Sequence, residues 1–228
     1  MSKKTKTAAS KKARMERIQQ YRREAIISTA EEFFINQGYD ATHVDQIADE
    51  AGYTKATIYN YFETKDDLFV AVVSRAYAKM LEVFEEALKR SGPQMALRVL
   101  GDAYVTFVYE YPRYAGLVDS GRVGLAIGRI IQKEETNQVL TESELDFRRK
   151  QLRIQELLTE AISETMKTST VQTKIDPYSV VMVLSTLGLA IRELALRGKR
   201  NNWSEEQSRK YLDVLLNIID RGLMHYAD

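Results

Sequence analysis

The chain reads THVDQIADEAGYTKATIYNYFETK from Thr42 to Lys65, and this pattern predicts two short helices joined by a tight turn. Thr42, three residues before Asp45, is expected to open the first helix, because its side-chain oxygen can accept an unpartnered backbone N–H. Apolar residues then recur at helical spacing, at Val44, Ile47, Ala48 and Ala51. Gly52 is expected to end this helix, because glycine readily adopts the left-handed conformation common at helix C-termini.

A second helix is predicted to start directly after the turn, with Thr54 as its N-cap. Ile58 and Phe62 are four residues apart and therefore share its inward face. At about 100° per residue, Ala56 and Asn60 lie on the opposite, outward face. Two helices joined by a short turn that contains glycine form a helix-turn-helix, whose second helix enters the major groove of DNA. We therefore expect a DNA-binding protein.

Composition and periodicity favour an all-α fold for the whole chain. It has 228 residues, of which 44% are hydrophobic, and only 11 Gly and 3 Pro to interrupt helices. A helix over Arg23–Gln37, ended by Gly38, is expected to brace the helix-turn-helix, and a helix of about 25 residues should follow Thr64. Further helices are predicted over Met95–Tyr111 and Glu144–Met166, after Asp176 and after Ser204, with a polar loop at Gln132–Ser143.

Charge is spread unevenly along the chain. Residues 1–23 hold nine Lys or Arg and one acidic residue, a net charge of +8, although the whole chain carries only +1. Few large apolar residues precede Ile18, so residues 1–22 are expected to form a flexible basic arm. The arm either adds contacts to DNA phosphates or to a minor groove, or it only raises solubility. We expect a DNA-binding domain at residues 23–69 and a larger helical domain at residues 70–228.

Several classes of chemistry lack the residues that they need. The chain has no Cys, which excludes disulfides, thiol nucleophiles and sulfur-ligated metals and fits a reducing cytoplasm. Its two histidines, His43 and His225, show no spacing to a nucleophile or a metal ligand, so we expect no enzyme, no metal and no cofactor. No apolar run reaches the roughly 18 residues of a membrane span, the longest being Val180–Ile191, and no signal peptide is recognisable. We expect a soluble, cytoplasmic protein.

The last two predicted helices indicate a homodimer. Val180–Ile191 is apolar on nearly all sides, so a helix here must be covered on more than one face. The final helix also carries an apolar stripe, and two such helices from each protomer can close a four-helix interface across a two-fold axis. The expected interface residues are Val181, Leu184, Gly188, Leu212, Leu215 and Ile219. The alternative is a helix hairpin buried within one chain.

The segment Arg23–Phe69 resembles the DNA-binding domain of the TetR family of bacterial transcriptional regulators. The family pattern G-Y/F-x-x-T, then I-A-x-x-A-G-V-S-x-x-T-L-Y-x-Y-F-x-x-K-x-x-L, stands here as GYDAT and IADEAGYTKATIYNYFETKDDLF. Tyr53, Thr54 and Ile58 replace the more usual Val, Ser and Leu. The resemblance covers about a fifth of the chain. It implies an N-terminal three-helix DNA-binding domain and a C-terminal helical domain that binds a small-molecule inducer and forms the dimer.

Position by position, the resemblance also implies the residues that meet DNA. Phosphate contacts are implied for Thr42, Tyr59, Tyr61 and Lys65, and base or mixed contacts for Lys55, Ala56, Thr57 and Asn60; Thr54 is included in the same surface. The outward position of Asn60 agrees, because Asn can bond adenine N6 and N7 together, and the methyl groups of Ala56 and Thr57 can meet a thymine methyl. Tyr59 and Tyr61 have an alternative role in packing against the first helix.

A ligand pocket is expected in the C-terminal domain, around a cluster of aromatic and charged residues: Tyr104, Phe107, Tyr111, Arg113, Tyr114 and Arg122. Such a cluster suits an apolar or aromatic ligand held by a few polar groups, although aromatic residues at helical spacing can also be ordinary core. The expected function is a dimeric repressor that binds a palindromic operator in double-stranded DNA and is released by a small-molecule inducer. The alternative on the same fold is a DNA-bound structural or cell-division factor that needs no ligand.

Overall fold

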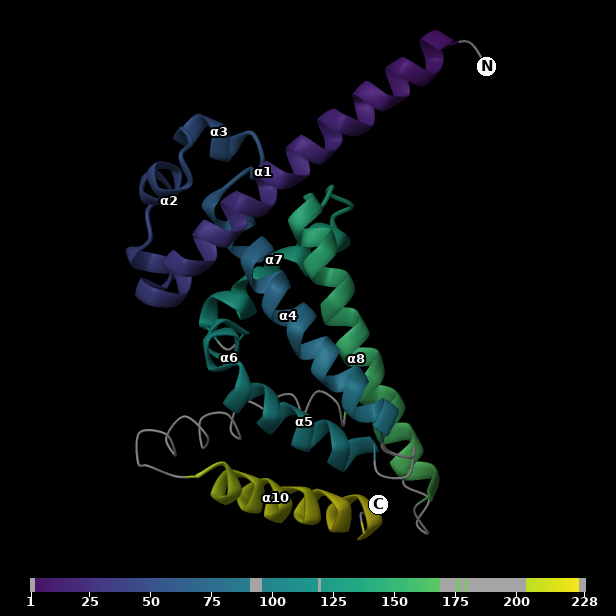
Figure 1. The fold of residues 1–228 in the computed structure, drawn as a ribbon. Coiled ribbons are helices and arrows are strands. Elements are labelled where there is room, and N and C mark those ends of the chain that lie inside the picture. Colours follow the sequence, from purple (N-terminus) through teal and green to yellow (C-terminus); the bar gives the residue numbers. More distant parts are fainter. Residues whose placement is uncertain are drawn as a thin grey trace. The chain divides into compact units, whose positions relative to one another are not determined.

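The computed structural model describes residues 3–90, 96–118, 120–168, 176, 179 and 204–225, and every regular element within these residues is an α-helix. The helices are α1 (Lys3–Ala41), α2 (Val44–Ala51), α3 (Lys55–Tyr59), α4 (Lys65–Arg90), α5 (Ala96–Glu110), α6 (Pro112–Val118), α7 (Gly121–Glu135), α8 (Glu142–Thr168) and α10 (Glu205–His225), labelled in Figure 1. The predicted all-α fold is therefore confirmed.

The chain divides into two compact units. The first, here called the head, comprises Met1–Ser74 and Gly121–Asp146, and the second, the body, comprises Arg75–Ser120 and Phe147–Asp228. The head thus contains the helix-turn-helix together with all of α7, which the sequence did not associate with it. The predicted division by function, into an arm at residues 1–22, a DNA-binding domain at 23–69 and a larger domain at 70–228, remains a prediction.

Helix α1 begins about 20 residues earlier than predicted. The described helix starts at Lys3, so the expected flexible arm over residues 1–22 does not match the structure, and α1 extends past α2 and α3 toward the N-terminus (Figure 1). The physical reason lies in composition, because Ala, Lys, Arg, Gln, Met and Glu favour helix even where no apolar face is available. Gly38 interrupts the helix as predicted, with φ 80° and ψ 170°, a conformation that is essentially restricted to glycine.

The start of α2 differs from the prediction. Its N-cap is His43, whose backbone N–H donates to Gln46 Oε1 at 2.9 Å. Thr42 is fully buried, and its hydroxyl donates to the carbonyl oxygen of Gly38 at 2.6 Å. A hydroxyl that bonds a carbonyl four residues earlier is oriented away from the following helix. The prediction that Thr42 caps α2 was therefore wrong, and Thr42 instead fixes the turn after α1.

The remainder of the helix-turn-helix follows the predicted pattern. Gly52 ends α2 in the left-handed conformation, with φ 71° and ψ 32°. Thr54 caps α3 by accepting the backbone N–H of Thr57 at 3.1 Å. Ile58 and Phe62 are each only 1% exposed, as expected for the inward face. Burial of these two side chains holds α3 against the rest of the head, so its other face is left outward.

Helix α4 confirms both its predicted cap and its predicted length. Thr64 Oγ1 accepts the backbone N–H of Asp67 at 3.0 Å, and the helix runs for 26 residues. Its regularly spaced apolar residues are all buried, namely Leu68, Val72, Ala76, Met80 and Phe84. The first part of α4, through Ser74, belongs to the head and the rest to the body, so one continuous helix supplies core residues to both units.

The predicted loop over Gln132–Ser143 is too long. Helix α7 continues to Glu135, and α8 begins at Glu142, where Thr141 and Glu144 form a capping box. In this box the Thr141 N–H donates to Glu144 Oε2 at 2.9 Å, and the Glu144 N–H donates to Thr141 Oγ1 at 3.1 Å. This Thr-x-x-Glu signal was present in the sequence and marks the helix start two residues before the predicted one.

Candidate nucleic-acid interface

The outward face of α3 and the turn after it form the candidate DNA-reading surface. Lys55, Ala56 and Asn60 are exposed, and Tyr59 is 43% exposed. Thr57 and Tyr61, beside them, are half-buried. The hydroxyl of Thr57 lies 2.9 Å from the hydroxyl of the exposed Thr54. The structure therefore brings most of the predicted DNA-binding residues together on one surface of the head.

Lys55 is held by an ion pair across the turn. Its Nζ lies 2.8 Å from Asp45 Oδ2, so α2 and α3 are joined at the surface that would meet DNA. The hydrogen bond to Asp45, followed by the charge of that carboxylate, raises the pKa of Lys55 above its ordinary value. Both side chains are more than half exposed, so a DNA phosphate can compete with Asp45 for the ammonium group.

Two predicted phosphate contacts have different surroundings. Thr42 is 0% exposed with its hydroxyl bonded to Gly38, so its side chain does not fit the predicted contact. Lys65 is half-buried, and its Nζ lies 4.1 Å from the centre of the Tyr39 ring. Partial burial lowers the pKa of Lys65, which is the largest influence on this group. Lys65 thus packs on an aromatic ring within the head, and its phosphate contact remains a prediction.

Tyr39 is the centre of a charged cluster that joins α1, α4 and α7 within the head. Its hydroxyl donates to Asp66 Oδ1, and Arg122 lies over its ring at 4.3 Å from the centroid. Arg122 also pairs with Asp40, and Arg129 pairs with Asp66 at 2.7 Å. Through these contacts α7 is bound directly to the helices that frame the helix-turn-helix.

The position of Arg122 corrects the predicted ligand pocket. Arg122 belongs to the head, whereas the other predicted pocket residues, Tyr104, Phe107, Tyr111, Arg113 and Tyr114, belong to the body. In the body, the buried Phe107 stacks with Tyr111 at 6.1 Å between ring centroids, and Lys79 lies 5.1 Å from the Tyr111 ring. These contacts equally suit a packed core, and the remaining five residues stay a prediction for the pocket.

The predicted dimer residues fall largely outside the described part of the chain. Val181, Leu184 and Gly188 lie in the segment that is not described, and so do the side chains of Leu212, Leu215 and Ile219, whose backbone belongs to α10. The same helix carries three described apolar residues that are exposed in the monomer, with exposed fractions of 49% for Tyr211, 52% for Val214 and 62% for Ile218. Their spacing of three and four residues places them on one face.

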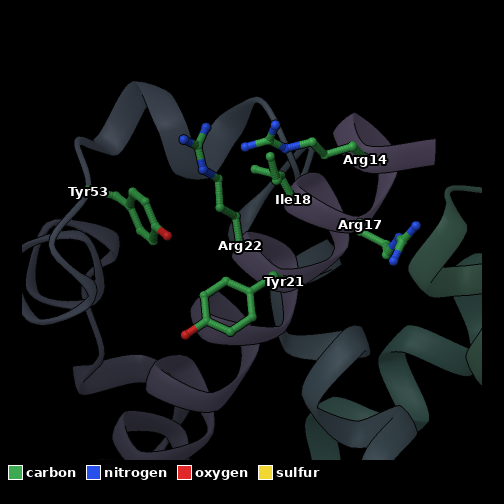
Figure 2. A pocket seen from close by; sticks show the side chains of 6 residues that line it. All are labelled: Arg14, Arg17, Ile18, Tyr21, Arg22 and Tyr53. Carbon is green, nitrogen blue, oxygen red and sulfur yellow. The ribbon is translucent and has the colours of Figure 1, made fainter. Parts of the chain in front are cut away.

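A basic cleft lies between α1 and the turn that precedes α3. Its volume is about 500 Å³, and it is lined by Arg14, Arg17, Ile18, Tyr21, Arg22 and Tyr53, as Figure 2 shows. The sequence indicated only that this part of the chain is basic. The helical spacing of Arg14, Ile18 and Arg22 could have indicated this basic surface. It was not used, because the segment was expected to be a flexible arm and not a helix.

The raised pKa of Tyr39 gives a testable dependence of stability on pH. Burial, reinforced by the hydrogen bond to Asp66 and the charge of that carboxylate, raises the pKa of Tyr39 to about 12. An unfolded tyrosine loses its proton near pH 10, so the contribution of Tyr39 is complete below about pH 10 and is lost as the pH rises through about 12. We expect wild type to lose more unfolding free energy than Tyr39→Phe between about pH 9 and pH 11 in urea titrations followed by circular dichroism. Parallel pH profiles would contradict this role.

Comparison with known proteins supports the geometry of the head. Residues 26–72 match the family model described as "Bacterial regulatory proteins, tetR family". The chain is 32% identical over 88 residues to the HTH-type transcriptional activator FasR of Mycolicibacterium smegmatis, covering 38% of this chain and 40% of that protein. It is 35% identical over 71 residues to the HTH-type transcriptional repressor BepR of Brucella suis, covering 31% and 34%. The chain thus spans well under half the length of these curated relatives.

A solved structure resembles the chain over most of its length. The transcriptional regulator FadR from Bacillus subtilis, solved in complex with stearoyl-CoA, aligns with a TM-score of 0.56 over 90% of this chain and 99% of that one. The sequences are only 17% identical over this alignment, so the likeness concerns the fold alone. It extends the similarity from the head to the helices of the body.

Proposed function

Because the N-terminal domain of this chain is a DNA-binding domain of the TetR family, we propose that the protein is a transcriptional regulator that binds a palindromic operator as a homodimer and is released by a small molecule. The observation that carries the proposal is the exposed surface of α3, held outward by the buried Ile58 and Phe62. Lys55, Ala56 and Asn60 present an ammonium group, a methyl group and an amide there, which are groups suited to phosphates and base edges.

The proposed dimer rests on the exposed apolar face of α10. Single exposed apolar residues are ordinary on a protein surface, but Tyr211, Val214 and Ile218 form one continuous helix face. A second copy of the chain would remove this face from water, and a two-fold axis would place two α3 helices on successive major grooves, about 34 Å apart. Because the two α3 helices of the dimer would be related by a two-fold axis, the DNA that they bind is expected to contain two inverted copies of one half-site.

The proposed ligand has an apolar or aromatic part and binds the body. The support is the group of aromatic residues on α5 and near α6, of which Phe107 and Tyr111 stack. The solved complex of FadR with stearoyl-CoA is consistent with a ligand that has a long apolar chain. The relatives FasR and BepR are an activator and a repressor. We propose repression because an operator-bound dimer blocks other proteins by occupancy.

Metal binding, membrane insertion and enzymatic activity are not part of the proposal. Within the residues that the structure describes, no group of three His, Cys, Asp or Glu side chains could hold a metal ion, and no helix is long and apolar enough to cross a membrane. The relatives with similar sequences are transcriptional regulators, and we propose no enzymatic activity. The cytoplasmic location and the absence of a cofactor remain predictions.

Selection of bound DNA from a random-sequence duplex pool tests the proposal without knowledge of the operator. We expect wild type to enrich an inverted repeat whose half-sites are about one helical turn apart, and Val214→Glu/Ile218→Glu to sediment as a monomer and enrich no paired half-sites. Glu206→Lys, a charge reversal at an exposed position of the same helix that lies about 80–140° around the helix from the exposed apolar residues, serves as the control. Enrichment of no sequence by the wild type would overturn the proposal. Mapping of bound sites across a genome separates a local regulator from a structural factor, which would occupy many sites.

A further inference from the structure

We propose that the N-terminal half of α1 is a second DNA-contacting element, in which Arg14 and Arg22 bind backbone phosphates beside the site that α3 reads. This inference rests on the proposed function, because it assigns further contacts to the same DNA. It differs from the expected flexible arm in its geometry. The contacts come from one face of an ordered helix, so their spacing is fixed before DNA arrives.

The charges of this part of α1 are segregated around the helix. At about 100° per residue, Arg14, Ile18 and Arg22 lie within an arc of roughly 80°, whereas Glu16 lies on the far side. Lys12 lies about 160° around the helix from Arg14 and pairs with Glu16, at 3.9 Å. Arg14 therefore lies away from the acid that pairs with Lys12, whereas Arg22 also borders a cleft that Glu16 lines.

Both arginines remain available to a ligand. Among the described residues, neither Arg14 nor Arg22 forms an ion pair or a hydrogen bond, and both side chains are exposed. Arg23 shows the contrast, because it is half-buried, donates to Ser143 at 3.0 Å and lies 5.0 Å from the Phe62 ring. Arg23 thus has a structural role, and its neighbour Arg22 has none that the described contacts reveal.

The basic cleft has the chemistry of a phosphate site. Figure 2 shows the guanidinium groups of Arg14 and Arg22 on the same side of α1 with Ile18 between them, while Arg17 extends in another direction. No acidic residue lines this cleft. Tyr21, 76% exposed, and Tyr53, in the turn between α2 and α3, add hydroxyl groups and rings suited to phosphate and deoxyribose. DNA fits better than an acidic protein, because this surface continues into the reading surface.

Arg22 supplies that continuity. It also lines a second cleft, of about 660 Å³, together with Thr57, Asn60 and Tyr61 from α3 and the turn after it. The second cleft includes Glu16 and Glu142, so it is less suited to phosphate than the first. A duplex seated on α3 would therefore meet Arg22 at its edge and Arg14 about two helical turns further along α1, roughly 12 Å away by the rise of a helix.

The salt dependence of DNA binding tests the inference. Each lost phosphate contact lowers the slope of log K against log salt concentration by about 0.9, so Arg14→Gln/Arg22→Gln is expected to lower it by about 1.8 per protomer. The duplexes are a 30-bp oligonucleotide of mixed sequence and the sequence recovered by selection, and the loss should be the same on both. Because Arg and Gln favour helices similarly, circular dichroism should show unchanged helix content.

Control variants separate the possible outcomes. Lys12→Gln removes one charge about 160° around α1 from Arg14 and should leave the slope nearly unchanged, whereas Arg14→Gln alone should lower it by about 0.9 per protomer. A slope in the double variant equal to that of the wild type would overturn the inference, as would an equal loss in Lys12→Gln and Arg14→Gln. If the wild type itself selects no sequence, the proposed function fails. If it selects one and the double variant keeps the full slope, only the α1 contacts fail.

Discussion

Replacing Phe62 by alanine is expected to lower the free energy of unfolding of the head by about 3–5 kcal/mol, the cost of removing a fully buried aromatic side chain. Phe62 is 1% exposed and directly follows the turn after α3. Its ring also receives the guanidinium group of Arg23 at 5.0 Å. The substitution therefore opens a cavity and leaves a half-buried cation without its aromatic partner. Since a small domain has only about 5–15 kcal/mol of stability, this loss would remove a large share of it and lower the unfolding midpoint.

Urea unfolding followed by circular dichroism, together with DNA binding, measures this effect. Tyr59→Ala is the matched control for stability alone, because Tyr59 is a nearby aromatic residue that is 43% exposed and is itself a predicted phosphate contact. Its effect on stability should stay within about 0.5 kcal/mol. Phe62→Leu should retain most of the stability, since it keeps the site apolar. Equal unfolding midpoints for wild type and Phe62→Ala would show that the ring does not hold α3 in place.

Replacing Asn60 by alanine is expected to relax the preference for one base pair in each half-site, at a cost of about 1–3 kcal/mol for the preferred base. Asn60 is exposed on the face opposite the buried Ile58, and its amide can donate to adenine N7 and accept from adenine N6. Its backbone N–H bonds the carbonyl oxygens of Ala56 and Thr57, at 3.1 and 3.2 Å, and the substitution leaves these bonds in place. The change should therefore alter recognition without unfolding α3.

The measurement is a repeated selection from random-sequence duplexes, with competition binding of operators changed at single base pairs. Asn36→Ala is a suitable control, because Asn36 is an exposed asparagine on α1 at the opposite end of that helix from the basic face. It should select the same sequence as the wild type. An Asn60→Ala protein with unchanged preference at every base pair would show that the amide reads no base.

The helix-turn-helix could be predicted because its signals are local. Ile58 and Phe62 are four residues apart, and Gly52 and Thr54 act on backbone groups within a few residues of themselves. Thr42 marks the limit of such reasoning. Its sequence context is compatible both with a cap on α2 and with a hydrogen bond back to the carbonyl oxygen of Gly38. Only the tertiary structure, in which the Thr42 side chain is buried, distinguishes the two. The helix at the N-terminus was not predicted, because residues 1–22 show no clear apolar periodicity. Their individual helix propensities, which favour a helix, were given less weight than that missing pattern.

The contacts of α7 could not be predicted from one sequence. Arg122 and Asp40 are 82 residues apart, and nothing in the local pattern of either residue indicates the other. Glycine is a poor helix former, yet the segment that contains Gly121, Gly124 and Gly128 forms one helix. The assignment of Arg122 to a ligand pocket followed from its nearness in sequence to the aromatic cluster. Tertiary structure instead places it over Tyr39.

The ion pair between Lys55 and Asp45 bears on how the protein searches a chromosome. Each cation that binds phosphate independently of sequence strengthens non-specific binding, so the protein stays longer on DNA that is not its operator. Because Asp45 already occupies Lys55, this lysine must exchange one partner for another, and its hold on arbitrary sequence is weakened. At the proposed operator, neighbouring base contacts would favour the exchange. We therefore expect the ion pair to shorten the time spent on non-operator DNA while it keeps Lys55 aligned for the operator.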